Sequence, residues 1–312
     1  MAADNAGILS RIPGLAYIGL VLTPLFWAGN AVVARGTVEH IPPLSMSFWR
    51  WIIALALLLP FGWPGVWRHR QVVRQHLGSM VALATFSVAA FNSLLYYAAL
   101  TTTATNIALI NSTIPIFVAL LAWLLLGDRT RPIQALGIGL AILGILAVVA
   151  RGDITVLTSL QAQPGDLIMV AAVFSWGLFS VLLRRQAVPL PPLTFLTVQI
   201  LLGTLVILPF YLADFLFFSG GFTLSQETAL PLIYFAIFPG ILAYGFWNHG
   251  VHQIGPANAA IFMYLTPVFA SVLASVFLGE SLGLFHVIGG ALILAGLLLA
   301  TRFGRRPPDY QR

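Results

Sequence analysis

Long apolar stretches separated by short polar segments run along almost the whole chain and predict an all-α integral membrane protein. A hydrocarbon core of about 30 Å needs about 20 apolar helical residues to cross it. This criterion gives ten predicted spans: residues 15–34, 44–61, 78–100, 104–126, 134–150, 165–183, 193–213, 229–251, 256–278 and 285–301. The third and fourth spans, like the eighth and ninth, are joined by very short turns, so counts of nine or eleven stay open.

The composition agrees with a chain that is solvated mainly by lipid. Of its 312 residues 59% are hydrophobic and only 8% are charged, whereas about 25% are charged in soluble domains. The chain has no cysteine, which excludes disulfides and thiolate metal sites. It also has no lysine, which excludes a P-loop ATP site, a retinal Schiff base and a pyridoxal phosphate site. We therefore predict no cofactor and no ATP hydrolysis by the P-loop route.

The arginines test the helix count and predict the orientation. If the amino terminus is cytoplasmic, twelve of the fifteen lie on the cytoplasmic side: Arg11, Arg68, Arg70, Arg74, Arg129, Arg131, Arg184, Arg185, Arg302, Arg305, Arg306 and Arg312. Only Arg35 and Arg151 lie on the other side, and Arg50 lies within a span. The positive-inside bias thus predicts a multi-pass protein of the inner (plasma) membrane with both termini cytoplasmic. It also explains the basic balance without a nucleic acid partner.

The two halves of the sequence overlay each other. A shift of 149 residues aligns the first two spans with the sixth and seventh: Trp27 with Trp176, Arg35 with Arg184, Pro42 and Pro43 with Pro191 and Pro192, Leu44 with Leu193, and Pro60 with Pro209. A shift of 152 aligns the fourth and fifth spans with the ninth and tenth: Asn106 with Asn258, Pro115 with Pro267, Gly127 and Asp128 with Gly279 and Glu280, Gly137 with Gly289, and Gly144 with Gly296. Five spans are an odd number, so the second unit must enter the membrane from the opposite side.

This pattern predicts an inverted-topology repeat, the architecture of many secondary transporters. The predicted organisation is a cytoplasmic segment 1–14, a first repeat 15–151, a second repeat 152–302 and a basic cytoplasmic tail 303–312. Arg11 followed by an apolar run also fits a cleaved signal peptide. That alternative is disfavoured, because the first span has a counterpart in mid-chain.

Matched motifs in the two halves resemble EamA-type units of the drug/metabolite transporter superfamily. Residues 111–128 (NSTIPIFVALLAWLLLGD) and 263–280 (MYLTPVFASVLASVFLGE) are similar to the fourth-helix signature, and FWAGN (26–30) and FWRW (48–51) to the first and second helices. The resemblance implies a ten-helix metabolite exporter, with amino acids a frequent substrate class, and is closest to the aromatic and neutral amino acid exporters of the YddG kind. Two positions depart from it: Asp128 replaces the usual Glu, and Gln199 stands at the repeat position of Arg50.

Polar and aromatic side chains inside the predicted spans are the candidates for a substrate cavity. Polar groups are costly in hydrocarbon and tend to face a cavity or a neighbouring helix. The candidates are Trp27, Asn30, Arg50, Asn92, Tyr96, Tyr97, Asn111, Trp176, Gln199, Tyr244, Asn248 and Tyr264. Aromatic faces with amide and phenol groups suit a solute that has a flat apolar part and a few hydrogen-bonding groups. The alternative is that each Asn or Tyr bonds a neighbouring helix and each Trp packs.

Arg50 is the only charge clearly inside a span. It can anchor a substrate carboxylate through its guanidinium fork, or reach the outer interface or bond carbonyls at helix ends; both interpretations stay open. The nine carboxylates fall at span ends, in loops or in tails: Asp4, Glu39, Asp128, Asp153, Asp166, Asp214, Glu227, Glu280 and Asp309. A proton-coupled cation pump usually needs an acid within the membrane, so this mechanism is disfavoured. Asp128 and Glu280 have a structural or a gating role.

Prolines and glycines in the spans predict where helices bend and approach each other. Pro115, Pro239 and Pro267 predict kinks, as gating hinges or as static features. The glycine pairs at 137/144 and 289/296 each share a helix face and predict close packing, within the protomer or between protomers. His249 and His252 also share a face, but no third ligand lies near them in the sequence, so we predict no metal site.

Together these features predict a secondary transporter that exports small neutral or zwitterionic metabolites, amino acids first, by alternating access. The predicted partners are a small-molecule substrate and membrane lipid; the oligomeric state, the exact substrate and proton coupling are left open. An intramembrane enzyme lacks support, because no G-x-S-x-G, H-E-x-x-H or buried acid pair is present. A channel fits the polar cavity but not the repeat. An anionic-metabolite carrier of the same superfamily needs several basic groups within the spans, but Arg50 alone is available there. A drug or cation exporter needs a carboxylate within a span, and the sequence places none there.

Overall fold

The computed structural model describes residues 13–35, 37, 40–150, 153, 155–158, 160–278 and 283–302, and in these ranges all the regular structure is helical. The candidates Arg151 and Glu280, and most of the predicted terminal segments, lie outside the described residues. Within them, the long helical segments are α2 (Pro13–Arg35), α3 (Pro43–Arg68), α5–η1–α6 (Leu77–Ala84, Thr85–Phe91, Asn92–Ala99), α7–α8 (Ala104–Asn111, Ile114–Leu126), α9 (Pro132–Val149), α11 (Pro164–Gln186), α12–η2 (Pro192–Asp214, Phe215–Ser219), α13–η3–α14 (Gln226–Phe235, Ala236–Leu242, Ala243–Ile254), α15–η4–α16 (Pro256–Ile261, Phe262–Leu265, Thr266–Leu278) and α17 (Leu284–Arg302). The short helices α4 (Arg70–Gln75) and α10 (Thr155–Thr158) lie in connections.

These segments follow the ten predicted spans within a few residues, apart from α3 and α12–η2, which extend further. In the described part of the chain, nine are long and apolar enough to cross a membrane, and α2 holds a shorter apolar helix, Gly14–Asn30. Proline in the first turn begins several helices, among them α3, α9, α11, α12 and α15; its missing N–H has no helical partner at that position anyway. The protein is therefore a multi-pass helical membrane protein.

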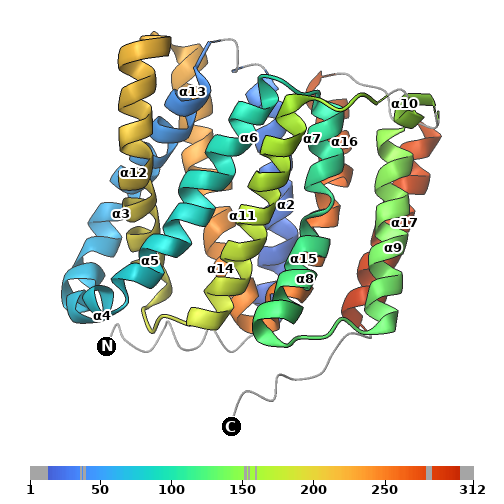
Figure 1. Ribbon diagram of the computed structural model, residues 1–312, viewed down its shortest axis with the longest axis horizontal. Coiled ribbons are helices and arrows are strands. Elements are labelled where there is room, and N and C mark those ends of the chain that lie inside the picture. The colour runs from blue at the N-terminus through green and yellow to red at the C-terminus, as the bar shows by residue number, and fades with distance from the viewer. Residues whose placement is uncertain are drawn as a thin grey trace.

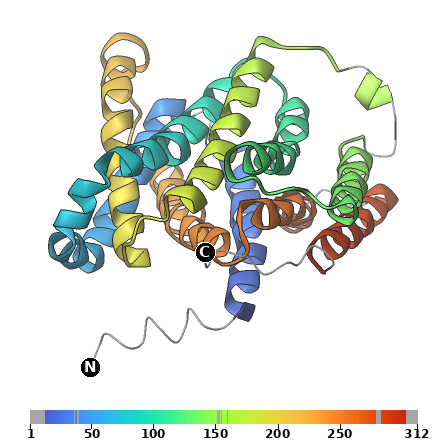
Figure 2. The same ribbon diagram turned by 60° about the horizontal axis from the view of Figure 1, so that its bottom comes forward.

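The helices alternate in direction and form a bundle with two distinct edges (Figures 1 and 2). At one edge α3 packs on α12, and at the other α9 packs on α17. Between these edges α2 packs on α14 and α16 of the second half, while α11 packs on α6, η1 and α8 of the first half. The first helix of each half thus contacts the third and fourth helical segments of the other, and the second and fifth helices each contact their own counterpart. This reciprocity is what a pseudo-two-fold relation between the halves requires.

The crossing of α9 and α17 depends on the four glycines that the sequence singled out. A Cβ on Gly137 would lie 2.6 Å from the carbonyl oxygen of Gly296, and one on Gly144 would lie 2.5 Å from that of Gly289. The opposite substitutions at Gly289 and Gly296 meet the carbonyls of Gly144 and Gly137 at 2.6 and 2.5 Å. The two helix backbones are therefore in direct contact, which places this glycine packing within the protomer.

Three of the long segments are interrupted where the sequence predicted kinks at proline. Pro115 and Pro267 lie where helical segments restart and not inside a continuous helix; whether they act as gating hinges or as static kinks stays a prediction. Each lies in the first turn of a helix, α8 or α16, that restarts after a break at 112–113 or after the 3₁₀ turn η4. Pro239 lies inside η3, a π-helical segment.

A second π-helical segment, η1, occupies the repeat-equivalent position. The 152-residue shift carries its residues 85–91 onto 237–243, and η3 spans Ala236–Leu242. π-helical turns are rare and occur frequently at functional sites, because they re-aim side chains and backbone carbonyls. The third helical segment of each half therefore has a π-helical turn at an equivalent position in the sequence, to within one residue, next to the residues described below.

Candidate substrate site

Polar side chains from both halves meet in the centre of the bundle. The first half contributes Arg50 from α3, Ser87 from η1, and Asn92 and Tyr96 from α6; the second half contributes Gln199 from α12, and Tyr244 and Asn248 from α14. Each of these side chains is at most 8% exposed. We call this set the central network.

In the first half, Arg50 organises the central network. Its Nη1 donates to the Tyr96 hydroxyl at 3.0 Å and to Asn92 Oδ1 at 3.4 Å. The guanidinium carbon lies 4.6 Å from the centroid of the neighbouring Trp51 ring, within range of a cation–π interaction. Arg50 is 1% exposed and bonds side chains of the bundle interior. The alternatives in which it reaches the interface or bonds helix-end carbonyls do not fit these contacts.

The second half repeats this arrangement with an amide in place of the guanidinium. Gln199, at the repeat position of Arg50, accepts at Oε1 from Asn248 Nδ2 at 2.8 Å. Asn248 stands at the repeat position of Tyr96, so equivalent residues are paired in both halves. Gln199 Nε2 also donates to Ser87 Oγ at 2.9 Å, which leaves both polar atoms of this amide hydrogen-bonded.

Asn92 and Tyr244, which are repeat-equivalent, join the two halves. Asn92 Nδ2 donates to the Tyr244 hydroxyl at 3.0 Å, and this hydroxyl donates to the Ser87 carbonyl at 2.8 Å. Ser87 lies in η1, and the equivalent residue of η3 is Pro239. The Pro239 carbonyl accepts from Trp27 Nε1 at 3.2 Å. Equivalent carbonyls of the two π-helical segments thus bind side chains.

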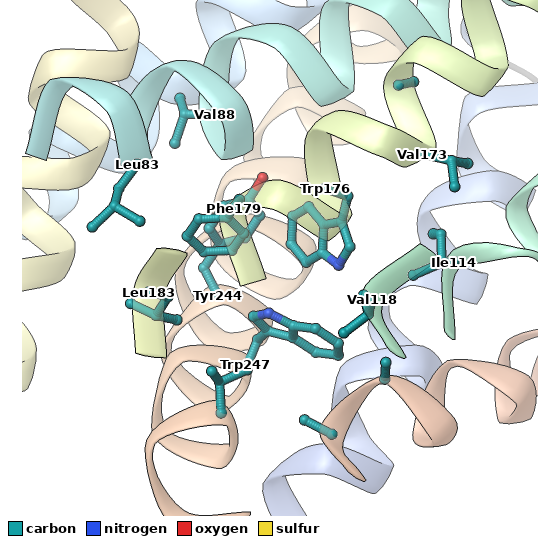
Figure 3. Packing of buried hydrophobic residues seen from close by; sticks show 14 of the residues in the cluster. Leu83, Val88, Ile114, Val118, Val173, Trp176, Phe179, Leu183, Tyr244 and Trp247 are labelled. Carbon is teal, nitrogen blue, oxygen red and sulfur yellow. The ribbon is translucent and has the colours of Figure 1, made fainter. Parts of the chain in front are cut away.

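An aromatic cluster covers one side of the central network. The Trp176 ring centroid lies 5.0 Å from Trp27, 5.5 Å from Tyr244 and 5.4 Å from Trp247, and Trp51 lies 5.0 Å from Tyr244. Figure 3 shows Trp176, Tyr244 and Trp247 packed together beside Phe179. In this conformation the rings are in contact, so a solute can enter between them only if the rings move apart.

Several buried donors in this region have no hydrogen-bond partner within the described residues. They are Arg50 Nε and the indole nitrogens of Trp51, Trp176 and Trp247; one acceptor of the network, Asn248 Oδ1, is also unpaired. Buried polar atoms are usually paired, and each exception calls for an explanation. Unpaired donors outnumber the unpaired acceptor, which suits a ligand that brings mainly acceptors.

The structure brings together most of the side chains that the sequence predicted for the cavity: Trp27, Arg50, Asn92, Tyr96, Trp176, Gln199, Tyr244 and Asn248. Tyr97 is 39% exposed and lies outside this group, because its side chain leaves the helix about 100° away from that of Tyr96. Asn30 and Asn111 are half-buried, and Tyr264 is buried at the helix break η4. Lining of a cavity by these residues remains a proposal.

Three central residues were missed from sequence: Trp51, Ser87 and Trp247. Trp51 directly follows Arg50, and Trp247 lies three residues after Tyr244, on the same helix face. The position of Trp51 next to Arg50 and the face that Trp247 shares with Tyr244 could therefore have identified both residues from the sequence. Ser87 acts largely through its backbone carbonyl in a π-helical turn, and nothing in the sequence marks that carbonyl.

A separate hollow of about 230 Å³ lies at one end of the bundle, where α7 meets the start of α11, and is lined by Asn106, Leu109, Ile110, Leu160, Gln161, Ala162 and Asp166. The Asp166 carboxylate accepts hydrogen bonds from Thr102 Oγ1, from Asn106 Nδ2 at 3.0 Å and from the Gln163 backbone N–H at 2.8 Å. Because these donors satisfy the carboxylate, we interpret it as a helix cap that ties the α6–α7 turn to α11.

Replacing Asp166 by alanine is expected to lower stability by about 1–2 kcal/mol, since both the cap and the link between segments are lost. Thermal unfolding of the purified protein in detergent measures this. Asp153→Ala is the matched control, because the exposed Asp153 carboxylate bonds the nearby Thr155, two residues along the chain, and within the described residues no other segment. Equal melting temperatures for the two variants would contradict the assigned role of Asp166.

The comparison with protein families agrees with this geometry. The model of the EamA-like transporter family matches twice, over residues 14–150 and 163–302. The chain belongs to this family. The two matches coincide with the two halves whose helices contact each other reciprocally.

Known relatives span nearly the full chain. An uncharacterised transporter of Archaeoglobus fulgidus is 28% identical over 90% of this chain and 96% of its own. A probable amino-acid metabolite efflux pump of Salmonella typhimurium and a probable terminal-alkyne amino-acid exporter of Streptantibioticus cattleyicolor are each 27% identical, over 92% of this chain and 94% of theirs. A crystal structure with a TM-score of 0.76 and 21% identity, covering 92% of this chain and 96% of that chain, has the same fold.

Proposed function

We propose that this family member is a secondary transporter that exports small neutral or zwitterionic metabolites, amino acids first among them, across the plasma membrane by alternating access of two inverted repeats. The observation that carries the proposal is the hydrogen bond between Asn92 and Tyr244, at 3.0 Å. These residues are equivalent in the two halves, so the bond crosses the centre of the bundle. A site assembled equally from both repeats is exposed to one side or the other when they rock against each other.

The chemistry of the central network supports a solute with polar and apolar parts. Amide, phenol and guanidinium groups lie beside an aromatic cluster that includes Trp27, Trp176 and Trp247. Amino acids present a charged or polar backbone and a side chain that such rings can cover. Two relatives named for amino-acid export lend this substrate class further support.

Counterflow in liposomes tests the proposal. Purified protein is reconstituted, loaded with unlabelled phenylalanine or leucine, and followed for uptake of the labelled amino acid with and without a proton gradient. Because no carboxylate within a predicted span is available to exchange a proton for substrate, we expect selective flux by facilitated movement, which does not need the gradient. Flux that appears only with the gradient would contradict facilitated movement, and the absence of flux for every amino acid would contradict the substrate class.

Tyr244→Phe is expected to lower this flux about tenfold. The variant loses both bonds of the hydroxyl and leaves the Asn92 amide and the Ser87 carbonyl with the longer bond of 3.3 Å between them. This costs about 1–3 kcal/mol, and 1.4 kcal/mol corresponds to a factor of ten. Tyr97→Phe is the matched control, since Tyr97 is 39% exposed. Unchanged flux in Tyr244→Phe would argue that the bond between the halves has no part in transport.

A further inference from the structure

We infer that Arg50 and Trp51 form a binding site for a single carboxylate, so that the solute transported through the central network must carry one. This inference rests on the proposed function and makes its substrate class more specific. It follows from the hydrogen bonds that the two side chains make and from their buried donors that have no acceptor within the described residues.

Arg50 is a buried cation whose hydrogen-bond partners are neutral. Its Nη1 donates to an amide oxygen and to a phenol oxygen. Its Nε is buried without an acceptor in the part of the chain that the structure describes. The sequence holds no Asp or Glu between Glu39 and Asp128, so α3, η1 and α6 bring no carboxylate to this charge. Asp214 of α12 and Glu227 of α13, helices that also pack on α3, are not among the hydrogen-bond partners of Arg50 in the described residues. A buried guanidinium with only neutral partners is costly, whereas pairing with an anion offsets its desolvation.

Trp51 carries a second unpaired donor, on a ring that lies against the Arg50 guanidinium. Its indole Nε1 is buried and, within the described residues, has no acceptor. Its ring lies 4.6 Å from the Arg50 guanidinium carbon and 5.0 Å from Tyr244. Neither donor is therefore committed to holding the fold together. A carboxylate has two oxygens that accept several hydrogen bonds and match the planar guanidinium fork.

The other half cannot form the same site. Gln199 replaces the arginine, and both of its polar atoms are already bonded, to Ser87 and Asn248. The central network thus carries one cation, which suits one carboxylate and not a diacid or a phosphate dianion. The apolar part of the solute would then face the aromatic cluster around Trp176 (Figure 3).

Three probes separate carboxylate recognition from general binding: L-phenylalanine, its amide, which lacks the carboxylate, and 3-phenylpropionate, which lacks the amine. Their effects on thermal stability in detergent and their counterflow are compared for the wild type, Arg50→Gln and Arg50→Lys. Glutamine is the side chain that the repeat position already carries, which favours folding of the first variant. We expect the wild type to bind both carboxylates and to discriminate against the amide. Arg50→Gln should lose at least about tenfold in affinity for the carboxylates, the worth of one charge-assisted contact.

The outcomes are distinct. Arg50→Gln with an undiminished preference for carboxylates over the amide overturns the inference. A wild type that transports phenylalanine and its amide equally also overturns it but leaves the proposed function standing, whereas a wild type that neither binds nor transports any probe overturns both. If Arg50→Gln does not fold, the Arg50→Lys variant tests the inference. Lysine keeps the positive charge but lacks the planar guanidinium, so an unchanged affinity for the two carboxylates would refute the assigned geometry.

Discussion

Gly144→Leu is expected to prevent the protein from reaching its folded state in the membrane. Even the first carbon of the new side chain would lie 2.5 Å from the carbonyl oxygen of Gly289, and 2.9 Å from the backbone nitrogen of Ile293. Backbone atoms cannot turn aside as a flexible side chain can, so α9 and α17 would have to separate along their whole contact. Overpacking costs about 1–3 kcal/mol for added methylenes in ordinary cores, and we expect Gly144→Ala to fall in this range and the leucine variant to exceed it.

Gly139→Leu is the matched control on the same helix. A Cβ there meets no atom within 4 Å, and the residue is exposed. Fluorescence-detected size-exclusion chromatography and thermal unfolding should show a normal profile for the Gly139 variant and aggregation or a strongly lowered melting temperature for Gly144→Leu. A folded, stable Gly144→Leu protein would mean that α9 and α17 do not cross where the glycines indicate.

The fold was largely predictable from the sequence because its signals are long and repeated. Apolar stretches of about 20 residues identify spanning helices, and the shift that aligns Gly137 with Gly289 also aligns Gly144 with Gly296. The helix breaks were less predictable. Pro115 was expected to bend a helix, but proline also fits the first turn of a new one. A bent helix and a newly started helix differ only in whether residues 112–113 continue the helical turn before Pro115.

The site was harder to predict, for a reason specific to membrane proteins. In a soluble helix the polar face points outward, but here the lipid-facing side is as apolar as the protein interior. Hydrophobic periodicity therefore does not indicate which face points to the centre. Tyr96 and Tyr97 are the clearest case: adjacent and chemically identical, they are 7% and 39% exposed. The repeat helped, because the shift of 152 residues aligns Tyr96 with Asn248. It did not help at Ser87, which contributes a backbone carbonyl in a π-helical turn that no residue type marks.

Asn92→Asp is expected to raise stability and abolish transport at the same time. The substitution places a carboxylate next to Arg50, at the position where Asn92 Oδ1 now lies 3.4 Å from Nη1. It also removes the Nδ2 donor to the Tyr244 hydroxyl and the Ser87 carbonyl, and the hydroxyl can turn to donate to the new carboxylate. The buried cation then has an internal partner. Breaking a buried ion pair costs about 3–5 kcal/mol, so completing one here should outweigh the lost donor bonds, which cost about 1–3 kcal/mol, and the melting temperature should rise. The same carboxylate occupies Arg50 and leaves it no charge to offer a solute, so counterflow of amino acids should stop.

Asn248→Asp is the control that the repeat provides. It introduces the same charge into the second half, where Asn248 bonds Gln199 and not an arginine. There the carboxylate faces the Gln199 carbonyl oxygen, so the melting temperature should fall. Opposite shifts for the two variants would tie both the stability and the transport effects to the cation at position 50. If Asn92→Asp were destabilising to the same degree as Asn248→Asp, then Arg50 would be unable to pair with a carboxylate. Its buried charge would then be a structural feature of α3 and would not select the solute.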